Sequence, residues 1–235
     1  MAAIKVLSTT AVKSSLDEIV PDFEATTGVT VTLTYTPSAQ IAARVLQNES
    51  VDVIVGTKEI LDELRGHGKL LDQTLAPIAR SLAGLAVRDG APRPDISSVA
   101  AFKKTLLNAK SIATSNPVGG GQSGKVLAAV LEKLGIADAL KPKLLYSPGG
   151  PAGLVGFFLT RGEAEIGIQQ MPELLAVPGV DVIGPLPSDI TIETVFSVAV
   201  SATPLNRAGA IRFAETLSES AASIVLRKKG FSPMN

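Results

Sequence analysis

The chain has 235 residues, with 22 basic and 22 acidic side chains, so its formal net charge is zero. This balance and the 4% aromatic content argue against a nucleic-acid partner, which needs basic excess and stacking platforms. The absence of cysteine excludes thiolate chemistry, and the single histidine excludes a metal site built from several histidines, so no metal or cofactor is expected. No apolar run approaches the roughly 20 residues that span a membrane.

Strands and helices alternate in the first part of the chain. The hydrophobic pattern predicts strands over 4–7, 29–35 and 51–55, and helices over 38–48 and around 60–64. The first helix is indicated by four apolar residues at helical spacing: Leu16, Ile19, Val20 and Phe23. Ser15 and Glu18 fit a capping box at its start, and Gly28 fits a stop.

The same alternation continues after residue 82. Strands are predicted over 82–87, 111–114, 144–146, 165–168 and 180–183, and a β-rich run over 192–200. Helices are predicted over 99–106 (capped by Ser97 or Ser98), 125–134 and 153–160, and in two stretches near 210–217 and 224–226. Strands separated by helices imply βαβ units with parallel sheets, and the length fits two α/β regions of about 100 residues.

Ligands of open α/β sheets bind beyond the carboxyl ends of strands, where helices begin. Four strand-to-helix loops are rich in hydroxyl, glycine or amide groups: 8–10, 36–38, 119–123 and 147–150. Backbone N–H groups and hydroxyls at helix N-termini suit an anion without a formal counter-charge. The same residue types are also ordinary turn and cap residues. Gln169 and Gln170 follow a predicted strand directly and are further candidates.

Other chemical motifs carry less weight. Residues 119–125 match the G-x-x-x-x-G-K pattern, but Val126 follows where a phosphate-binding loop needs Ser or Thr for magnesium. His67 lies between two glycines and is interpreted as a solvated loop residue. The carboxylates of Glu163 and Glu165 are candidates for a general base pair or simply a solvated face. Candidate counter-charges for a multivalent carboxylate, or ordinary surface charges, are Arg44, Lys125 and Arg161.

The opening VLSTTAVKSSLDEIVPDFEATTGVTVTLTYTPSAQ and the later segments SNPVGGGQSGKVLAAVLEKLGI, GPAGLVGFFLTRGEAEIGI and FAETLSESAASIVLRKKGF carry a family resemblance. In order and spacing they resemble periplasmic solute-binding proteins of bacterial ABC importers, nearest the molybdate/tungstate-binding family. The resemblance implies a type II fold of two α/β lobes, each a mainly parallel sheet flanked by helices, with the hinge crossed twice. Lobe I would comprise 1–80 and 195–235, and lobe II 81–194.

The resemblance also implies a ligand site in the cleft between the lobes. At the positions that bind the ligand in molybdate-binding relatives, however, this chain has other residues. Ala11 and Ala39 stand where molybdate-binding relatives have serine, with Thr10 and Ser38 one residue earlier. Gln169 or Gln170 replaces a tyrosine of those relatives. The expected ligand is therefore an oxyanion such as molybdate or a small organic carboxylate. The full set of expected ligand-binding residues is Thr9, Thr10, Ser38, Ala39, Gly119, Gly120, Gly121, Gln122, Ser123, Gly149, Gly150, Gln169 and Gln170.

Two functions follow from this resemblance. The first is a non-enzymatic, monomeric binding protein that closes around a small anion and delivers it to the membrane permease of an ABC importer. The second is an isomerase of a small unsaturated tricarboxylate, similar to aconitate isomerase, whose base would be a carboxylate or an activated hydroxyl. A cytoplasmic anion sensor is a third possibility. Because the N-terminus shows no leader pattern, the expected location is periplasmic if a leader was removed and otherwise cytoplasmic.

Overall fold

The computed structural model describes residues 3–118, 121–191, 193–232 and 234. The chain divides into two compact units, unit 1 with Met1–Ser81 and Thr194–Asn235, and unit 2 with Leu82–Glu193. The chain leaves unit 1 within β4 (Ala76–Arg88) and returns to it at the start of β9 (Glu193–Val200). The expected lobe limits lie one residue from these positions. It stays a prediction that the two units move as separate lobes.

Unit 1 is built on a sheet whose strands mostly run in one direction. β1 (Ala3–Thr9) lies between β2 (Thr30–Thr36) and β3 (Val53–Thr57) and is parallel to both. β9 pairs with β3 in the antiparallel sense. The carboxyl ends of β1, β2 and β3 therefore meet at one edge of the sheet.

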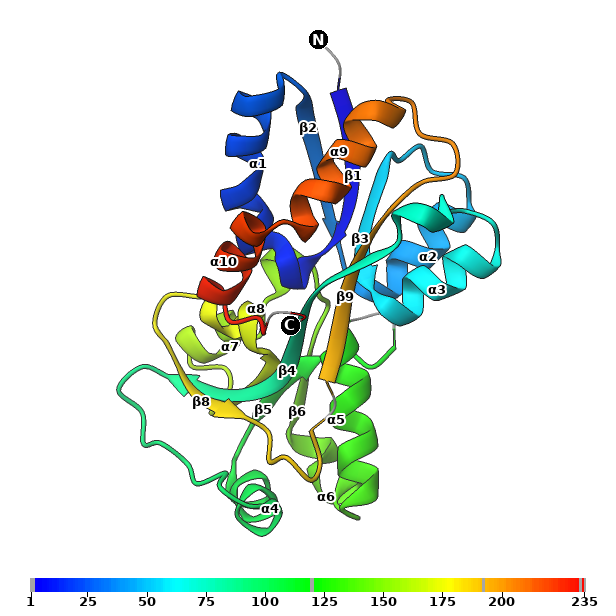
Figure 1. Ribbon diagram of the computed structural model, residues 1–235. Helices are drawn as coiled ribbons and strands as arrows, with labels where there is room; N and C mark the ends of the chain where they lie inside the picture. The colour runs from blue at the N-terminus through cyan, green and yellow to red at the C-terminus, as the bar shows by residue number, and fades with distance from the viewer. Residues whose placement is uncertain (1–2, 119–120, 192, 233, 235) are drawn as a thin grey trace. The chain divides into compact units, whose positions relative to one another are not determined.

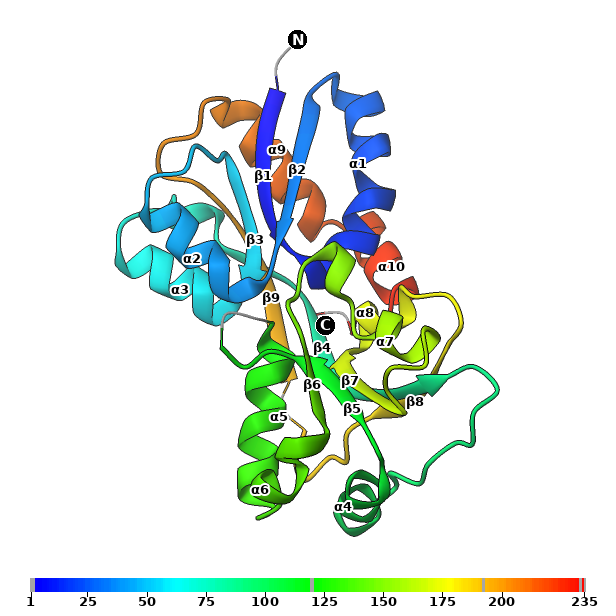
Figure 2. The same cartoon turned by 180° about the vertical axis from the view of Figure 1, so that it is seen from behind.

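Helices cover both faces of this sheet (Figures 1 and 2). One face carries α1 (Lys13–Thr27), α9 (Arg207–Ser218) and α10 (Ser220–Lys228), and the other carries α2 (Ser38–Leu46) and α3 (Lys58–Gly66). Two short 3₁₀ turns complete the unit, Thr10–Val12 and Asp72–Thr74. Leu16, Ile19, Val20 and Phe23 are buried, as their helical spacing predicted, and Phe23 packs edge-to-face on Phe213 with the ring centroids 4.9 Å apart.

The ends of α1 test the capping predictions. Gly28 is the residue after the helix and has a φ of +70°, the left-handed conformation that glycine adopts freely, so the predicted stop is confirmed. The predicted capping box is wrong, because α1 begins at Lys13 and its N-cap is Val12. The 3₁₀ turn Thr10–Val12 leads directly into the helix and places Ser15 inside the first turn.

Unit 2 has a second sheet with a parallel centre. β5 (Ile112–Ser115) lies between β6 (Leu144–Ser147) and β7 (Ile166–Gln170), and both neighbours are parallel to it. β4 is antiparallel to β7 and to β8 (Val180–Pro185). The carboxyl ends of β5, β6 and β7 therefore form a shared edge, as in unit 1.

The helices of unit 2 also pack on both faces of its sheet (Figure 2). α4 (Val99–Asn108), α5 (Gln122–Lys133) and α6 (Ala137–Leu140) enclose one apolar core, and α7 (Gly156–Thr160) and α8 (Met171–Leu175) the other. Two 3₁₀ turns, Lys141–Lys143 and Pro151–Gly153, precede β6 and α7. Of the two predicted caps of α4, Ser98 is the one used, since its Oγ accepts the Ala101 N–H at 3.1 Å.

Several elements of unit 2 differ from the prediction, and α5 begins at Gln122 rather than Lys125. β4 begins at Ala76 rather than Leu82, so the strand crosses the limit between the units. The helix predicted over 153–160 is shorter, since a 3₁₀ turn occupies Pro151–Gly153 and α7 begins at Gly156. The helices α6 and α8 were not predicted, because four or five residues are too few for a helical period to show.

Candidate anion-binding site

Threonine ends three neighbouring strands of unit 1. Thr9 ends β1 and pairs in register with Thr36 at the end of β2, and Thr57 ends β3. The Thr9 Oγ1 lies 2.7 Å from the Oγ of Ser38, the first residue of α2. The structure thus brings the predicted residues Thr9 and Ser38 together, with Thr10 next in the chain.

Two of these hydroxyls are buried without a hydrogen-bond partner among the described residues. Thr10 and Thr57 are 5% and 1% exposed, and neither Oγ1 has a donor or acceptor within reach. Thr57 stands at the N-cap of α3, yet its side chain makes no capping bond. Buried polar groups are normally hydrogen-bonded, and an unsatisfied one costs about 1–3 kcal/mol. A water molecule or a ligand at this edge would satisfy both hydroxyls. The hydroxyls of Ser15, Thr114 and Thr191 are likewise buried without a partner among the described residues.

Backbone groups add to this cluster of hydroxyls. α2 begins at Ser38 and α3 at Lys58, both directly after strands that end at the same edge. The first-turn N–H groups of a helix have no acceptor within the helix and lie at the positive end of its dipole. Lys58 is itself engaged by Asp62, so the donors of this cluster are hydroxyls and amides rather than charged side chains.

A second cluster lies at the corresponding edge of unit 2. Ser115 pairs in register with Ser147, and Gln169 follows the pair formed by Thr114 and Ile168. The Oγ atoms of Ser115 and Ser123 lie 3.1 Å apart, so α5 is attached at its second residue to the end of β5. Hydroxyls at the end of parallel strands and the start of a helix again define an anion-favouring edge.

The glycines of this cluster bring backbone groups close to one another. Gly121 is the N-cap of α5, and a Cβ on Gly124 would lie 2.3 Å from the carbonyl oxygen of Ser115. Gly149 and Gly150 have φ angles of +79° and +75°, which glycine alone adopts without strain. The Gly149 N–H donates to Ser147 Oγ at 3.0 Å. The predicted residues Gly119 and Gly120 lie outside the described residues.

The other predicted site residues have different surroundings. The Gln169 Oε1 accepts the Val155 N–H at 2.8 Å, so this oxygen holds the chain before α7. Gln170 is 2% exposed, and Gln122 is the half-buried first residue of α5. Ala11 is buried in the turn after β1, and Ala39 is half-buried in α2; neither side chain can form a hydrogen bond.

The carboxylates of Glu163 and Glu165, the candidate general base pair, lie away from the hydroxyl clusters. Glu163 forms an ion pair with Arg161, and Glu165 accepts the Lys110 N–H at 2.7 Å. Both side chains are exposed and precede β7, whereas the hydroxyl cluster lies at the other end of that strand. The structure therefore separates this pair from Ser115 and Ser123.

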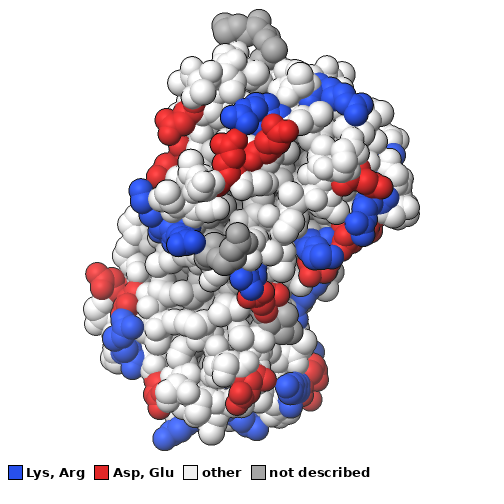
Figure 3. Space-filling view, in the orientation of Figure 1, with Lys and Arg blue, Asp and Glu red and all other residues white. Residues whose placement is uncertain are grey.

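The candidate counter-charges and the histidine are also surface groups. Arg44 is engaged by Glu49, Lys125 is exposed on α5, and His67 is exposed just after α3. Figure 3 shows acidic and basic side chains intermixed over the face that it presents. Across the described residues, no three His, Cys, Asp or Glu side chains are grouped to hold a metal ion, and no helix is long and apolar enough to cross a membrane.

One buried carboxyl was not predicted from the sequence. Glu173 lies in the first turn of α8, directly after the end of β7, and is 8% exposed. Burial raises the pKa of this carboxyl to about 8, and the Gln170 backbone N–H opposes the shift. A carboxyl with a pKa near neutrality can both accept and donate a proton under physiological conditions.

Comparison with known proteins identifies the fold and the family. The mixed α/β fold, with its two parallel-centred sheets, is that of type II periplasmic solute-binding proteins, as the sequence predicted. The family model for bacterial extracellular solute-binding proteins matches residues 4–232. The chain belongs to this family.

Individual relatives differ in what their names say they do. An aconitate isomerase from Pseudomonas sp. is 30% identical over 239 residues, covering 100% of this chain and 89% of the relative. The periplasmic molybdate-binding protein of Azotobacter vinelandii superposes with a TM-score of 0.81 at 18% identity, covering 99% of this chain and 100% of the other. The sulfate-binding protein SubI of Mycobacterium tuberculosis H37Rv gives a TM-score of 0.83 at 20% identity, covering 100% and 88%.

Proposed function

We propose that this chain binds a small anion, an oxyanion or a small carboxylate, and delivers it to the membrane permease of an ABC importer from a periplasmic location. The observation that carries the proposal is the pair of buried, unpartnered hydroxyls of Thr10 and Thr57 at strand ends where helices begin. Hydroxyls and helix N-termini stabilise an anion through fixed dipoles. Membership of the solute-binding family supports the transport role.

In this proposal the hydroxyl clusters of unit 1 and unit 2 both contact the same bound anion. Ser123 in unit 2 and Ser38 in unit 1 occupy equivalent places, each near the start of a helix and in contact with a hydroxyl at a strand end. In the hinge-closure mechanism expected from the sequence, binding requires donors from both units. Substitutions in either unit should then lower the affinity for the same ligand.

Removing the unpartnered hydroxyls should weaken anion binding strongly. A hydrogen bond to a charged group contributes about 1.5–3 kcal/mol, so we expect Thr10→Ala or Thr57→Val to lower affinity roughly 10- to 100-fold. The ligand is first found by thermal shift with molybdate, tungstate, sulfate, phosphate, citrate, the aconitates and tricarballylate. A ligand at about 1,000 times its Kd should raise the Tm by about 8–16 °C. Calorimetric titration of each variant then gives the change in Kd.

A matched control separates binding from folding. Thr26→Ala removes the same atoms from an exposed threonine of α1, whose hydroxyl bonds its own helix, and should leave the Kd unchanged. Ser123→Ala tests unit 2 with the same ligand. If Thr10→Ala and Thr57→Val bind as tightly as the unaltered protein, these hydroxyls are not ligands and the assignment is wrong. If only unit 1 variants lose affinity, the shared site is wrong.

A second candidate function is isomerisation of a small unsaturated tricarboxylate. It is favoured by the buried carboxyl of Glu173, four residues beyond Gln169, and by the 30% identity to an aconitate isomerase. Moving a double bond next to a carboxylate requires a base that removes a carbon-bound proton and an acid that returns one. Glu173 is the group that this function would use.

Proton exchange tests the isomerase directly. The unaltered protein should exchange a methylene proton of cis- or trans-aconitate for deuterium in heavy water, followed by ¹H NMR. Glu173→Gln should abolish exchange while retaining ligand binding, and Glu163→Gln, an exposed carboxylate in an ion pair, should exchange normally. Binding of aconitate without proton exchange would reject the isomerase function and would be consistent with the transport role alone. Normal exchange by Glu173→Gln would reject Glu173 as the base.

A further inference from the structure

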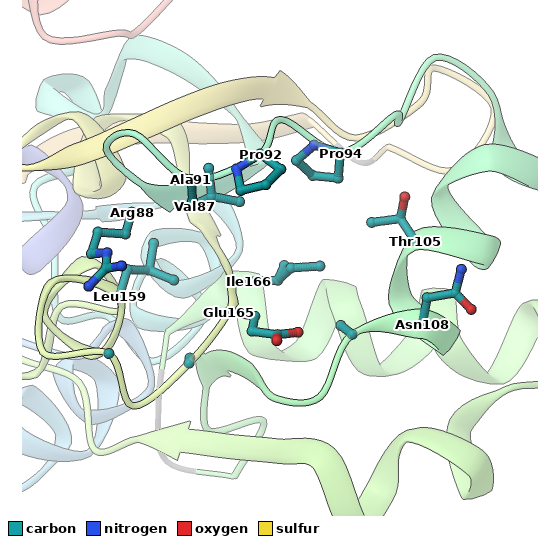
Figure 4. Close-up of a pocket in the computed structure, with 13 residues that line it drawn as sticks. Val87, Arg88, Ala91, Pro92, Pro94, Thr105, Asn108, Leu159, Glu165 and Ile166 are labelled. Carbon is teal, nitrogen blue, oxygen red and sulfur yellow. The ribbon is translucent and has the colours of Figure 1, made fainter.

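Unit 2 contains a pocket that the proposed function does not use. It has a volume of about 630 Å³ and is lined by 13 residues from β4, the following loop, α4, α7 with the loop after it, and the start of β7 (Figure 4). Ile166 begins β7, whereas Gln170 ends it, so the pocket and the hydroxyl cluster lie about 13 Å apart along the strand. A ligand in the pocket therefore leaves the anion site free.

The walls of the pocket are mainly apolar. Val87, Leu159 and Ile166 are buried in the apolar cores of unit 2 and line the pocket with neighbouring alanines and prolines. A volume of this size, apolar walls and a few polar groups are the usual properties of a small-molecule site. Figure 4 shows Arg88 and Leu159 toward one end, and Thr105 and Asn108 toward the other.

Among the described residues that line the pocket, Arg88 is the one cationic side chain. Three carboxylates of this region are engaged: Asp181 by Arg93, Glu163 by Arg161, and Glu165 by Lys110. Glu165 itself lines the pocket, where its carboxylate accepts the Lys110 N–H at 2.7 Å and lies 3.8 Å from the Lys110 ammonium. Arg88 lines the pocket and has no ion pair among the described residues. Asp89 follows it in the chain but does not line the pocket.

We propose that this pocket binds a small monocarboxylic acid with an apolar body, whose carboxylate pairs with the Arg88 guanidinium. A planar guanidinium matches a carboxylate with two parallel hydrogen bonds. The aromatic or branched body of the acid packs against Val87, Leu159 and Ile166. Asn108 at the opposite end offers a hydrogen bond to a polar substituent. The pocket is thus a second ligand site, independent of the anion carried by the hydroxyl clusters.

Three probes test the chemistry with the full chain. Phenylacetate carries charge and an apolar body, phenylacetamide carries the body alone, and acetate carries the charge alone. In titrations followed by amide chemical shifts, phenylacetate should bind with a Kd of roughly millimolar or tighter. It should shift the signals of Arg88, Asn108 and Ile166, and the other two probes should bind at least about tenfold more weakly.

Variants identify the residue responsible. Arg88 is exposed, so Arg88→Gln should fold normally and bind phenylacetate roughly tenfold more weakly. Arg93→Gln, which alters a nearby arginine outside the lining, should bind as the unaltered protein does. Equal binding of phenylacetate and phenylacetamide, an unchanged Kd in Arg88→Gln, no binding below about 10 mM, or shifts confined to Thr57 and Ser115 would each overturn the proposal.

Discussion

Replacing Gly124 by alanine should destabilise the protein by about 3 kcal/mol and lower its Tm by about 6–12 °C. The added Cβ would lie 2.3 Å from the carbonyl oxygen of Ser115 and 2.8 Å from its carbonyl carbon. These are backbone atoms at the end of β5, which is held on both sides by β6 and β7. The strand cannot yield, so α5 must move away.

Movement of α5 would disturb both the apolar core of unit 2 and the hydroxyl cluster at the end of β5. Val126 and Leu127 of α5 are 3% and 1% exposed and belong to the larger core of unit 2. Ser123 would also be drawn away from Ser115, where their hydroxyls now lie 3.1 Å apart. We therefore expect Gly124→Ala to weaken anion binding in addition to lowering the free energy of unfolding.

Gly66→Ala is the matched control for this substitution. A Cβ on Gly66 meets no atom within 4 Å, and the residue ends α3 without a positive φ. Alanine there should be neutral or stabilise the protein by up to about 1 kcal/mol. Urea unfolding of both variants gives the comparison. A Gly124→Ala protein as stable as the Gly66→Ala protein would show that α5 does not pack on β5 in this way.

The course of the chain was largely predictable because long amphipathic segments carry a clear period. Leu16, Ile19, Val20 and Phe23 are buried as expected, and Gly28 ends their helix. β4 extends over Pro77, a residue that central strands avoid, so the local pattern does not mark the start of this strand. The local pattern gives the order of the strands and of the longer helices, and tertiary packing decides their exact ends.

The candidate site was only partly predictable. Thr9, Thr10 and Ser38 were expected from their place after strands, and the same rule applied to β3 would have found Thr57. That Thr10 and Thr57 lack partners follows from three-dimensional neighbours, which no local pattern contains. The Gln169 Oε1 accepts the Val155 N–H, a contact that the sequence does not indicate. A ligand-binding role for Gln169 stays a prediction. Nothing in the sequence marks Glu173 as buried.

Burial of Glu173 should make the stability of the protein depend on pH in an unusual direction. Its pKa in the folded protein is raised from 4.5 to about 8, so folding favours the protonated form. Below about pH 4.5 the carboxyl is protonated in both the folded and the unfolded chain, so its ionisation does not change the free energy of unfolding. As the pH rises toward 8, the unfolded chain ionises first, and stability falls by about 3–4 kcal/mol between about pH 5 and pH 8.

Glu173→Gln removes this dependence. Glutamine keeps an oxygen that can accept the Gln170 N–H and has no charge at any pH. The Tm of the variant, measured against that of the unaltered protein at each pH, should rise by about 7–14 °C between about pH 5 and pH 8. Measuring the difference at each pH cancels the contribution of all other titrating groups.

The control is a carboxylate shifted in the opposite sense. Lys229 holds the pKa of Glu18 below its usual value, so its contribution to stability is present at neutral pH and lost as the pH falls. Glu18→Gln should therefore show no gain in relative Tm as the pH rises. A relative Tm of Glu173→Gln that stays constant with pH would mean that Glu173 is ionised in the folded protein, and would remove its candidacy as the proton-transferring group.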